Sequence, residues 1–130
     1  PNDLPCEEVD LDSLIERADI LSLHLALTDE TESILNAERL QMLGSNAILV
    51  NTARGALIEE AALLECLREN RIGHAALDVF MEEPLPGDSP YIDLKNVTLT
   101  AHAGWMTTEA SINLLRMSLE ELAREIASQG

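Results

Sequence analysis

Four side chains in this sequence have the types and spacing for acid–base chemistry on an anionic substrate: Arg54, Asp78, Glu83 and His102. Arginine stays charged, and its planar guanidinium fits a carboxylate through two parallel hydrogen bonds. Histidine gives or takes a proton near neutral pH, and a carboxylate beside the ring favours the protonated form. Together they suit a 2-oxo acid, with Arg54 holding the acid group and His102 protonating the carbonyl oxygen as a hydride reaches the carbon.

Each of these residues also has an ordinary structural interpretation. A single histidine at the end of a strand is often structural, and Glu82-Glu83 before a proline is typical of a solvated turn. An alternative for Arg54 is that it caps a helix or pairs with Glu59. The catalytic interpretation therefore requires that the three chain segments meet in space.

The candidate residues lie where strands are expected to end. An apolar run at 47–51 is followed by Thr52-Ala53-Arg54-Gly55 and a helical pattern at about 58–70, which predicts a strand, a tight turn and a helix. Apolar runs predict further strands at 20–25, 74–80 and 96–101. Strands separated by helices predict a parallel sheet with right-handed crossovers. The carboxyl ends of parallel strands share one edge, where an open α/β sheet binds its ligands.

The remaining elements predict an incomplete sheet. Helical patterns are present at 11–18, 36–44, 58–70 and for about twenty residues from Thr107. The connection from Met81 to Asp93 is rich in proline, and a connection of this length is usually functional or disordered. If the strands lie in sequence order, both crossover helices cover the same face. The other face is then left to the first helix, to the last helix or to nothing, so half of a doubly wound sheet is missing.

Composition narrows the class of protein. The 130 residues fit one domain, and 46% of them are hydrophobic. No apolar run approaches the roughly 20 residues of a membrane span. The net charge of −16 disfavours nucleic acid and anionic lipid as partners. Cys6 and Cys66 are too few for a disulfide framework, which predicts reduced thiols in a cytoplasmic protein.

Four motifs follow one another along the chain. They are Ser22-Leu23-His24-Leu25-Ala26-Leu27-Thr28, Val50-Asn51-Thr52-Ala53-Arg54-Gly55, Ala76-Leu77-Asp78-Val79-Phe80-Met81-Glu82-Glu83-Pro84-Leu85 and Asn96-Val97-Thr98-Leu99-Thr100-Ala101-His102. With these motifs, from about Leu11 to Ala127, the chain resembles the D-isomer-specific 2-hydroxyacid dehydrogenases. That family includes phosphoglycerate dehydrogenases and glyoxylate/hydroxypyruvate reductases.

The resemblance implies a homodimeric enzyme that uses NAD or NADP to transfer a hydride between the nicotinamide and a 2-hydroxy or 2-oxo acid. It implies that Arg54 binds the substrate and that His102 is the catalytic acid/base. Glu83, the glutamate directly before the proline, matches the acid that pairs with the histidine. The cofactor contacts that the resemblance implies are Leu25, Thr52, Ala53, Arg54, Asp78, His102, Ala103, Gly104 and Trp105. No metal ligand is implied.

The sequence departs from the family pattern in two ways. Ala101 and Ala26 stand where the family usually or commonly has proline, and Trp105 follows the histidine closely where small residues are usual. The six glycines form no G-x-G-x-x-G, the turn that holds a dinucleotide pyrophosphate. We therefore expect residues 1–130 to be the C-terminal portion of a Rossmann-type dinucleotide-binding domain. The glycine-loop half and the substrate domain are expected to be absent, and the chain alone is expected to be inactive.

Two other functions stay open at this stage. One is a non-catalytic interaction module on the same scaffold, like the transcriptional co-repressors among the family's relatives. The retention of Arg54, Glu83 and His102 together counts against such a module, because binding alone needs no acid/base pair. The other is an unrelated acidic regulatory domain, which requires the four motifs to be accidental. NAD and NADP both remain candidates, since the residue that reads the ribose is expected upstream of Pro1.

Overall fold

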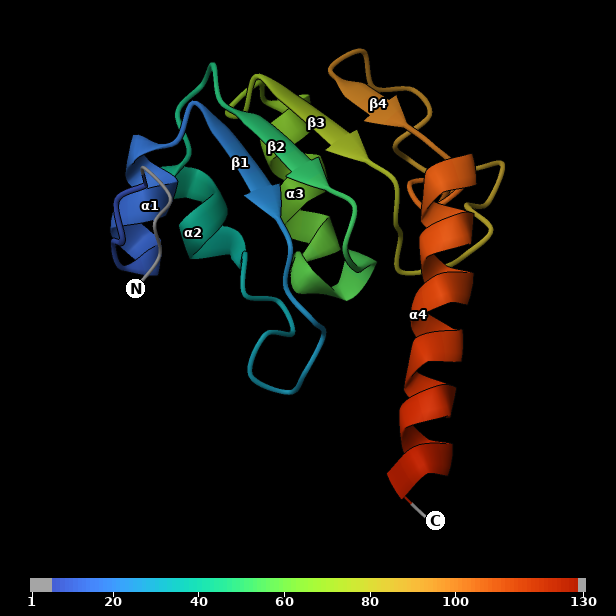
Figure 1. Cartoon of the computed structure of the whole chain (residues 1–130). Helices are drawn as coiled ribbons and strands as arrows, with labels where there is room; N and C mark the ends of the chain where they lie inside the picture. The colour runs from blue at the N-terminus through green and yellow to red at the C-terminus, as the bar shows by residue number, and fades with distance from the viewer. Residues whose placement is uncertain (1–5, 129–130) are drawn as a thin grey trace.

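The computed structural model describes residues 6–128 and contains a four-stranded parallel sheet (Figure 1). Its strands are β1 (Ile20–Leu23), β2 (Ile48–Asn51), β3 (His74–Leu77) and β4 (Val97–Leu99). They are paired in the order β1-β2-β3-β4, so the predicted parallel arrangement is confirmed. Each strand is shorter than predicted: β1, β3 and β4 end earlier, where the chain turns into the loops that form the site, and β2 begins one residue later.

The helices lie where the periodicity predicts them. They are α1 (Leu11–Arg17), α2 (Ala37–Met42), α3 (Glu60–Arg68) and α4 (Thr108–Ser128). The Asp10 side chain caps α1 by accepting from the Ser13 N–H, and Asn36 caps α2 in the same way through the Arg39 N–H. A short 3-10 helix, η1 (Gly55–Leu57), precedes α3 where the sequence predicts only a turn. It lies directly behind Arg54 and brings the chain from β2 to α3.

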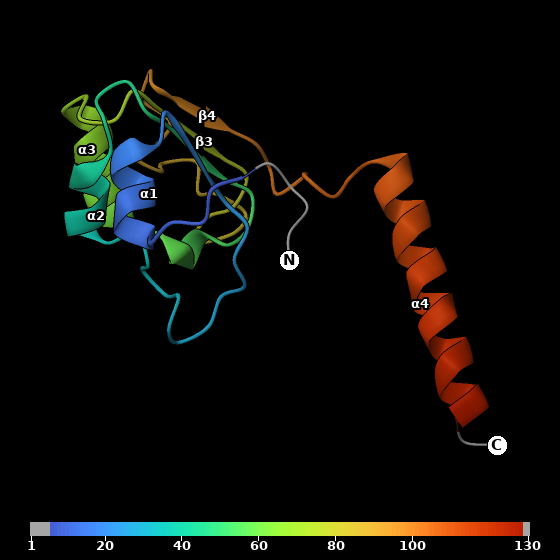
Figure 2. The same cartoon turned by 60° about the vertical axis from the view of Figure 1, so that its left-hand side comes forward.

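Helices α1, α2 and α3 cover one face of the sheet and form the core with it (Figure 2). Alternate strand residues point to this face, as the two-residue period of a strand requires. The buried strand residues are Leu21, Leu23, Leu49, Asn51, Ala75 and Leu77. From α3, Leu63 and Leu67 are each 1% exposed and pack against them. The crossover helices therefore share one face, as the sequence order of the strands predicts.

The opposite face of the sheet is not covered by any helix among residues 6–128 (Figure 2). Ile20 on β1 is 64% exposed and Ile48 on β2 is 38% exposed on this face. The first helix lies with α2 and α3, and α4 stands apart from the sheet with no buried residue. Of the three alternatives for that face, which were the first helix, the last helix or no helix, the described residues show the third. None of the helices within residues 6–128 has the length and apolar character needed to cross a membrane.

Candidate active site

The candidate catalytic residues lie at the carboxyl edge of the sheet. Arg54 follows β2, Asp78 directly follows β3, Glu83 lies on the loop after β3, and His102 follows β4. Because the strands are parallel, all of these loops leave the sheet on the same side. The hydrogen bond with His102 is the largest cause that lowers the pKa of Glu83, and the charge of Arg54 adds a smaller effect. The shared edge, the His102–Glu83 contact and the close packing of Gly55 against Phe80 show that the segments predicted to meet are brought together.

Glu83 and His102 form a direct pair. His102 Nδ1 lies 2.6 Å from Glu83 Oε2, and the two side chains are 40% and 35% exposed respectively. The other carboxylate oxygen, Glu83 Oε1, accepts a hydrogen bond from the Phe80 N–H at 3.0 Å. This second bond orients the carboxylate from within its own loop. Within residues 6–128 no protein group bonds His102 Nε2, so this ring nitrogen is available to a substrate.

Asp78 is buried beneath the His102 loop, with 5% of its surface exposed. Its Oδ1 accepts from the Thr100 hydroxyl and from the Ala103 N–H, and its Oδ2 accepts from the Gly104 N–H. Burial raises the pKa of Asp78, but these three hydrogen bonds outweigh it and hold the pKa below its ordinary value. The carboxylate is therefore ionised at neutral pH and serves as an acceptor for the loop.

Asn51 holds the Arg54 turn through side-chain hydrogen bonds, as Asp78 holds the His102 loop. The Asn51 side chain is 1% exposed; its Nδ2 donates to the Arg54 carbonyl at 2.9 Å, and its Oδ1 accepts from the Ala53 N–H at 3.0 Å. The Arg54 side chain is exposed, and its guanidinium donates to the Ala53 carbonyl at 2.6 Å. The alternative pairing with Glu59 is wrong, because Glu59 accepts instead from the Ala37 N–H at 2.9 Å. Arg54 does occupy the N-terminal cap position of η1, but its side chain makes no capping hydrogen bond there.

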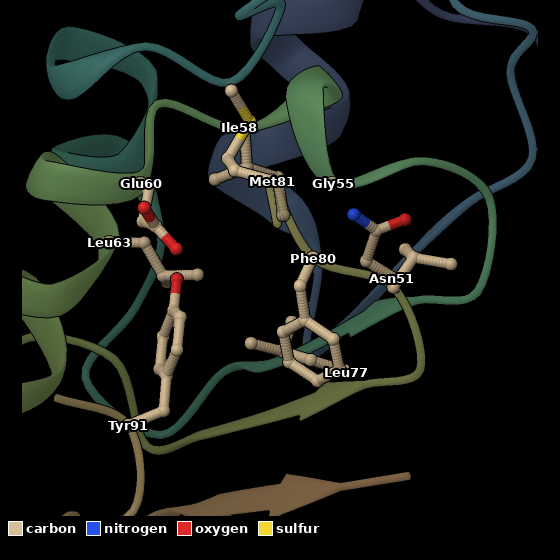
Figure 3. A pocket seen from close by; sticks show the side chains of 10 residues that line it. Asn51, Gly55, Ile58, Glu60, Leu63, Leu77, Phe80, Met81 and Tyr91 are labelled. Atoms are coloured by element: carbon tan, nitrogen blue, oxygen red, sulfur yellow. The ribbon is translucent and has the colours of Figure 1, made fainter. Parts of the chain in front are cut away.

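Gly55 allows the Arg54 turn to lie directly against the loop that carries Glu83 (Figure 3). A Cβ at this position would overlap the backbone of Phe80 and Met81. Gly55 has an ordinary negative φ, so its absent side chain, and not its conformational freedom, is what this position requires. The Arg54 turn and the loop that carries Glu83 are thus packed backbone to backbone.

A groove of about 500 Å³ lies beside Arg54 at the ends of β1 and β2. Its lining residues are His24, Leu25, Ala26, Leu27, Thr52, Ala53 and Arg54. Leu25, Thr52, Ala53 and Arg54 are among the predicted cofactor contacts, and the structure brings these four together. His24, Ala26 and Leu27 are lining residues that the prediction omitted. Their position just beyond β1, at the same edge as Arg54, is the signal that could have identified them.

A second cavity, of about 690 Å³, lies against the Glu83–His102 pair. It is lined by Phe80, Glu83, Pro84, Leu85, Leu99, Thr100, Ala101 and His102. Most of this lining is apolar, and the half-exposed Glu83–His102 pair lies at one side of it.

The remaining predicted cofactor contacts line neither cavity. Asp78 is buried beneath the loop, Ala103 and Gly104 direct their N–H groups to it, and Trp105 is 61% exposed. No group of three or more His, Cys, Asp or Glu side chains within residues 6–128 is arranged to hold a metal ion. The groups that this edge presents for chemistry are a proton donor paired with a carboxylate and an exposed cation.

Comparison with known proteins finds a group of similar dehydrogenases. The sequence profile of the D-isomer specific 2-hydroxyacid dehydrogenase NAD binding domain matches residues 1–104. A glyoxylate reductase of Aeropyrum pernix is 44% identical over 120 residues, which are 92% of this chain and 36% of that protein. A D-3-phosphoglycerate dehydrogenase of Methanocaldococcus jannaschii is 50% identical over 101 residues, which are 78% of this chain and 19% of that protein.

A solved structure agrees with these sequence matches. The D-isomer specific 2-hydroxyacid dehydrogenase of Xanthobacter autotrophicus Py2, in complex with NADPH and MES, aligns with a TM-score of 0.68 and 43% identity over 71% of this chain and 30% of its own. The chain thus spans between 19% and 36% of the length of these three relatives. The parallel sheet, the matched profile and the sequence identity lead to one conclusion. This chain belongs to the NAD-binding domain family of the D-isomer-specific 2-hydroxyacid dehydrogenases.

Proposed function

We propose that this chain is part of an NAD(P)-dependent enzyme that transfers a hydride between the nicotinamide and a 2-hydroxy or 2-oxo acid. The observation that carries the proposal is the Glu83–His102 pair at the same sheet edge as the exposed Arg54. A module that only binds a partner has no need of an acid/base pair, so this pair argues against the co-repressor-like alternative. The unrelated regulatory domain is excluded by the family match.

In the proposed reduction, Arg54 binds the carboxylate of the 2-oxo acid through its planar guanidinium. His102, protonated at both ring nitrogens, donates to the carbonyl oxygen through Nε2 while Nδ1 stays bonded to Glu83. Glu83 keeps the ring oriented, and its negative charge favours the imidazolium form before transfer. In the reverse direction His102 takes the proton from the hydroxyl group of the 2-hydroxy acid.

The groove beside Arg54 fits the proposed cofactor site, because Ala26, Thr52 and Ala53 leave room for a flat ring or a sugar at the ends of the strands. Leu25 supplies an apolar contact toward the adenosine side. His102, Ala103, Gly104 and Trp105 remain proposed contacts on the nicotinamide side; Asp78, proposed with them, is buried and lies behind Ala103 and Gly104. When bound, the nicotinamide gives or accepts the hydride; NAD and NADP are both suitable for this step.

We further propose that residues 1–130 act as the C-terminal portion of the dinucleotide-binding domain in a longer homodimeric enzyme. The greater length of the relatives supports the proposal that this chain is part of a longer protein. The uncovered apolar residues of α4 and of the bare sheet face support contact with further protein. The free thiols of Cys6 and Cys66 support a cytoplasmic location, and the charge of −16 argues against nucleic acid or membrane partners.

The test compares this chain with the complete enzyme that contains it. We expect the complete enzyme to oxidise NADH or NADPH when glyoxylate or hydroxypyruvate is added. We expect the 130-residue chain alone to turn over neither substrate and to bind NAD weakly by calorimetry, since it has no glycine-rich pyrophosphate turn. A complete enzyme that binds the cofactor yet reduces no 2-oxo acid would favour the interaction module. A micromolar dissociation constant for NAD with the chain alone would contradict the partial-domain proposal.

A further inference from the structure

Asp78 occupies an unusual position for a residue expected to touch the cofactor. It is buried, and both of its carboxylate oxygens accept hydrogen bonds from the loop that carries His102. We propose that Asp78 is a positioning residue that holds the His102 backbone in the conformation that presents the imidazole to Glu83. This inference rests on the proposed function, because it concerns the same proton transfer.

The hydrogen bonds of Asp78 bracket His102 on both sides. Thr100, two residues before the histidine, donates its hydroxyl to Oδ1. Ala103 donates its N–H to Oδ1 at 2.9 Å, and Gly104 donates its N–H to Oδ2 at 2.8 Å. One carboxylate thus binds groups that precede and follow the histidine. The chain must turn sharply at His102 for these three groups to reach one side chain.

The backbone of His102 shows that turn. Its φ is +51°, in the left-handed region that is uncommon for residues other than glycine, although histidine adopts it more often than most. Such a conformation persists only where the surroundings impose it. Gly104 allows the close approach, because a Cβ there would lie 3.0 Å from Asp78 Oδ2. The hydrogen bonds to the Asp78 carboxylate therefore stabilise a backbone conformation of His102 that is unfavourable by itself.

The effect of Asp78 on the reaction passes through the ring of His102. If the backbone relaxes to an extended conformation, Nδ1 moves away from the 2.6 Å contact with Glu83. The imidazole then loses both its orientation and the charge that favours its protonated form. Arg54, which is proposed to bind the substrate carboxylate, follows a different strand and is held by Asn51. A defect at Asp78 should therefore lower kcat and leave KM for the 2-oxo acid nearly unchanged.

The test uses Asp78→Asn in the complete enzyme. Asparagine keeps the shape but replaces one acceptor oxygen by an N–H₂ donor, which cannot accept from the loop. We expect kcat for reduction to fall by up to about 100-fold, as when a reacting group is slightly misplaced, with KM for the 2-oxo acid changed less than about twofold. Thr100→Val, which removes the hydroxyl and leaves both backbone bonds, should show a smaller loss. Glu82→Gln, an exposed carboxylate on the same loop as Glu83, is the matched control and should behave as wild type.

A double-mutant cycle separates positioning from a general loss of stability. In the wild-type background Glu83→Gln should move the pH profile of kcat/KM. In the Asp78→Asn background the same substitution should move it little, because His102 no longer meets Glu83. If Asp78→Asn only destabilised the protein, fewer molecules would be active. In those molecules Glu83→Gln would still move the pH profile of kcat/KM as it does in wild type. An unchanged response, or a loss confined to cofactor affinity, would overturn the proposal.

Amide hydrogen exchange supplies a readout that does not depend on turnover. The Ala103 and Gly104 N–H groups should exchange slowly in wild type and much faster in Asp78→Asn, while the core amides of β2 and β3 keep their protection. Equal exchange of the two loop amides in both proteins would overturn the positioning role. A wild-type enzyme that reduces no 2-oxo acid but shows this difference would contradict the proposed function and still support the assignment of Asp78.

Discussion

The His102 side and the Arg54 side of the site are built on the same plan but are fixed to different extents. On each side a buried polar side chain at the end of a strand binds loop backbone: Asp78 binds the loop after β4, and Asn51 binds the turn that follows it. Only on the first side is the functional side chain also held, through the 2.6 Å contact between Glu83 and His102. Among residues 6–128 the Arg54 guanidinium bonds only a neighbouring carbonyl and is exposed.

This difference follows from the two chemical tasks. Proton transfer requires the ring nitrogen to point at one oxygen atom in the correct protonation state, so the orientation must exist before the substrate arrives. Capture of a carboxylate requires only a charged fork within reach, and the fork completes its geometry when the anion binds. The comparison therefore predicts that changes on the His102 side act mainly on kcat, and that changes at Arg54 act on both binding and rate.

The largest effect is expected for His102→Ala. This variant removes the proposed proton donor, and loss of a general acid typically costs about 10²- to 10⁴-fold in rate. We expect reduction of the 2-oxo acid to be nearly abolished at every pH. The side chain is 40% exposed, so the circular dichroism spectrum and the melting temperature should stay close to those of wild type. Substantial reduction by a folded His102→Ala enzyme would show that another group supplies the proton.

A smaller loss is expected for Arg54→Lys. Lysine keeps the charge but lacks the planar fork, so one of the two hydrogen bonds to the carboxylate is lost. Because a hydrogen bond to a charged group is worth about 1.5–3 kcal/mol, kcat/KM for the 2-oxo acid should fall about 10- to 100-fold. The affinity for NAD, measured by calorimetry, should change little. Equal losses for substrate and cofactor would indicate a structural role for Arg54 and would remove the distinction between the two sides.

The smallest effect is a shift in pH dependence for Glu83→Gln. The hydrogen bond with His102, followed by that from the Phe80 N–H, lowers the pKa of Glu83, so its carboxylate stays ionised as the pH falls toward the acidic range. Reduction requires imidazolium, so kcat/KM should fall as the pH rises, and the ionised Glu83 delays that fall to higher pH. Without the charge of Glu83 the fall should move to lower pH. Superimposable profiles for wild type and Glu83→Gln would mean that Glu83 does not act on His102, and Glu82 would be tested next.

Local patterns were sufficient to predict much of the fold. Apolar runs located the four strands, and their alternation with helices predicted the parallel sheet. The strand ends then placed Arg54, Glu83 and His102 at one edge before any contact was known. The structure adds His24, which the prediction did not name, to the residues that line the groove beside Arg54. Contacts of that kind depend on how a loop runs after its strand ends.

By itself, the sequence determined which residues could do chemistry and at which edge of the sheet they lie, because strand and helix periods are local properties. Only the tertiary structure decided what the buried polar side chains bind. Asp78 and Asn51 look alike as polar residues at strand ends, yet one holds the loop after β4 and the other holds its own turn. The need for glycine at position 55 also arises from a backbone 25 residues away in the chain, at Phe80. Such partners are chosen by the paths of distant segments in space, which no local pattern encodes.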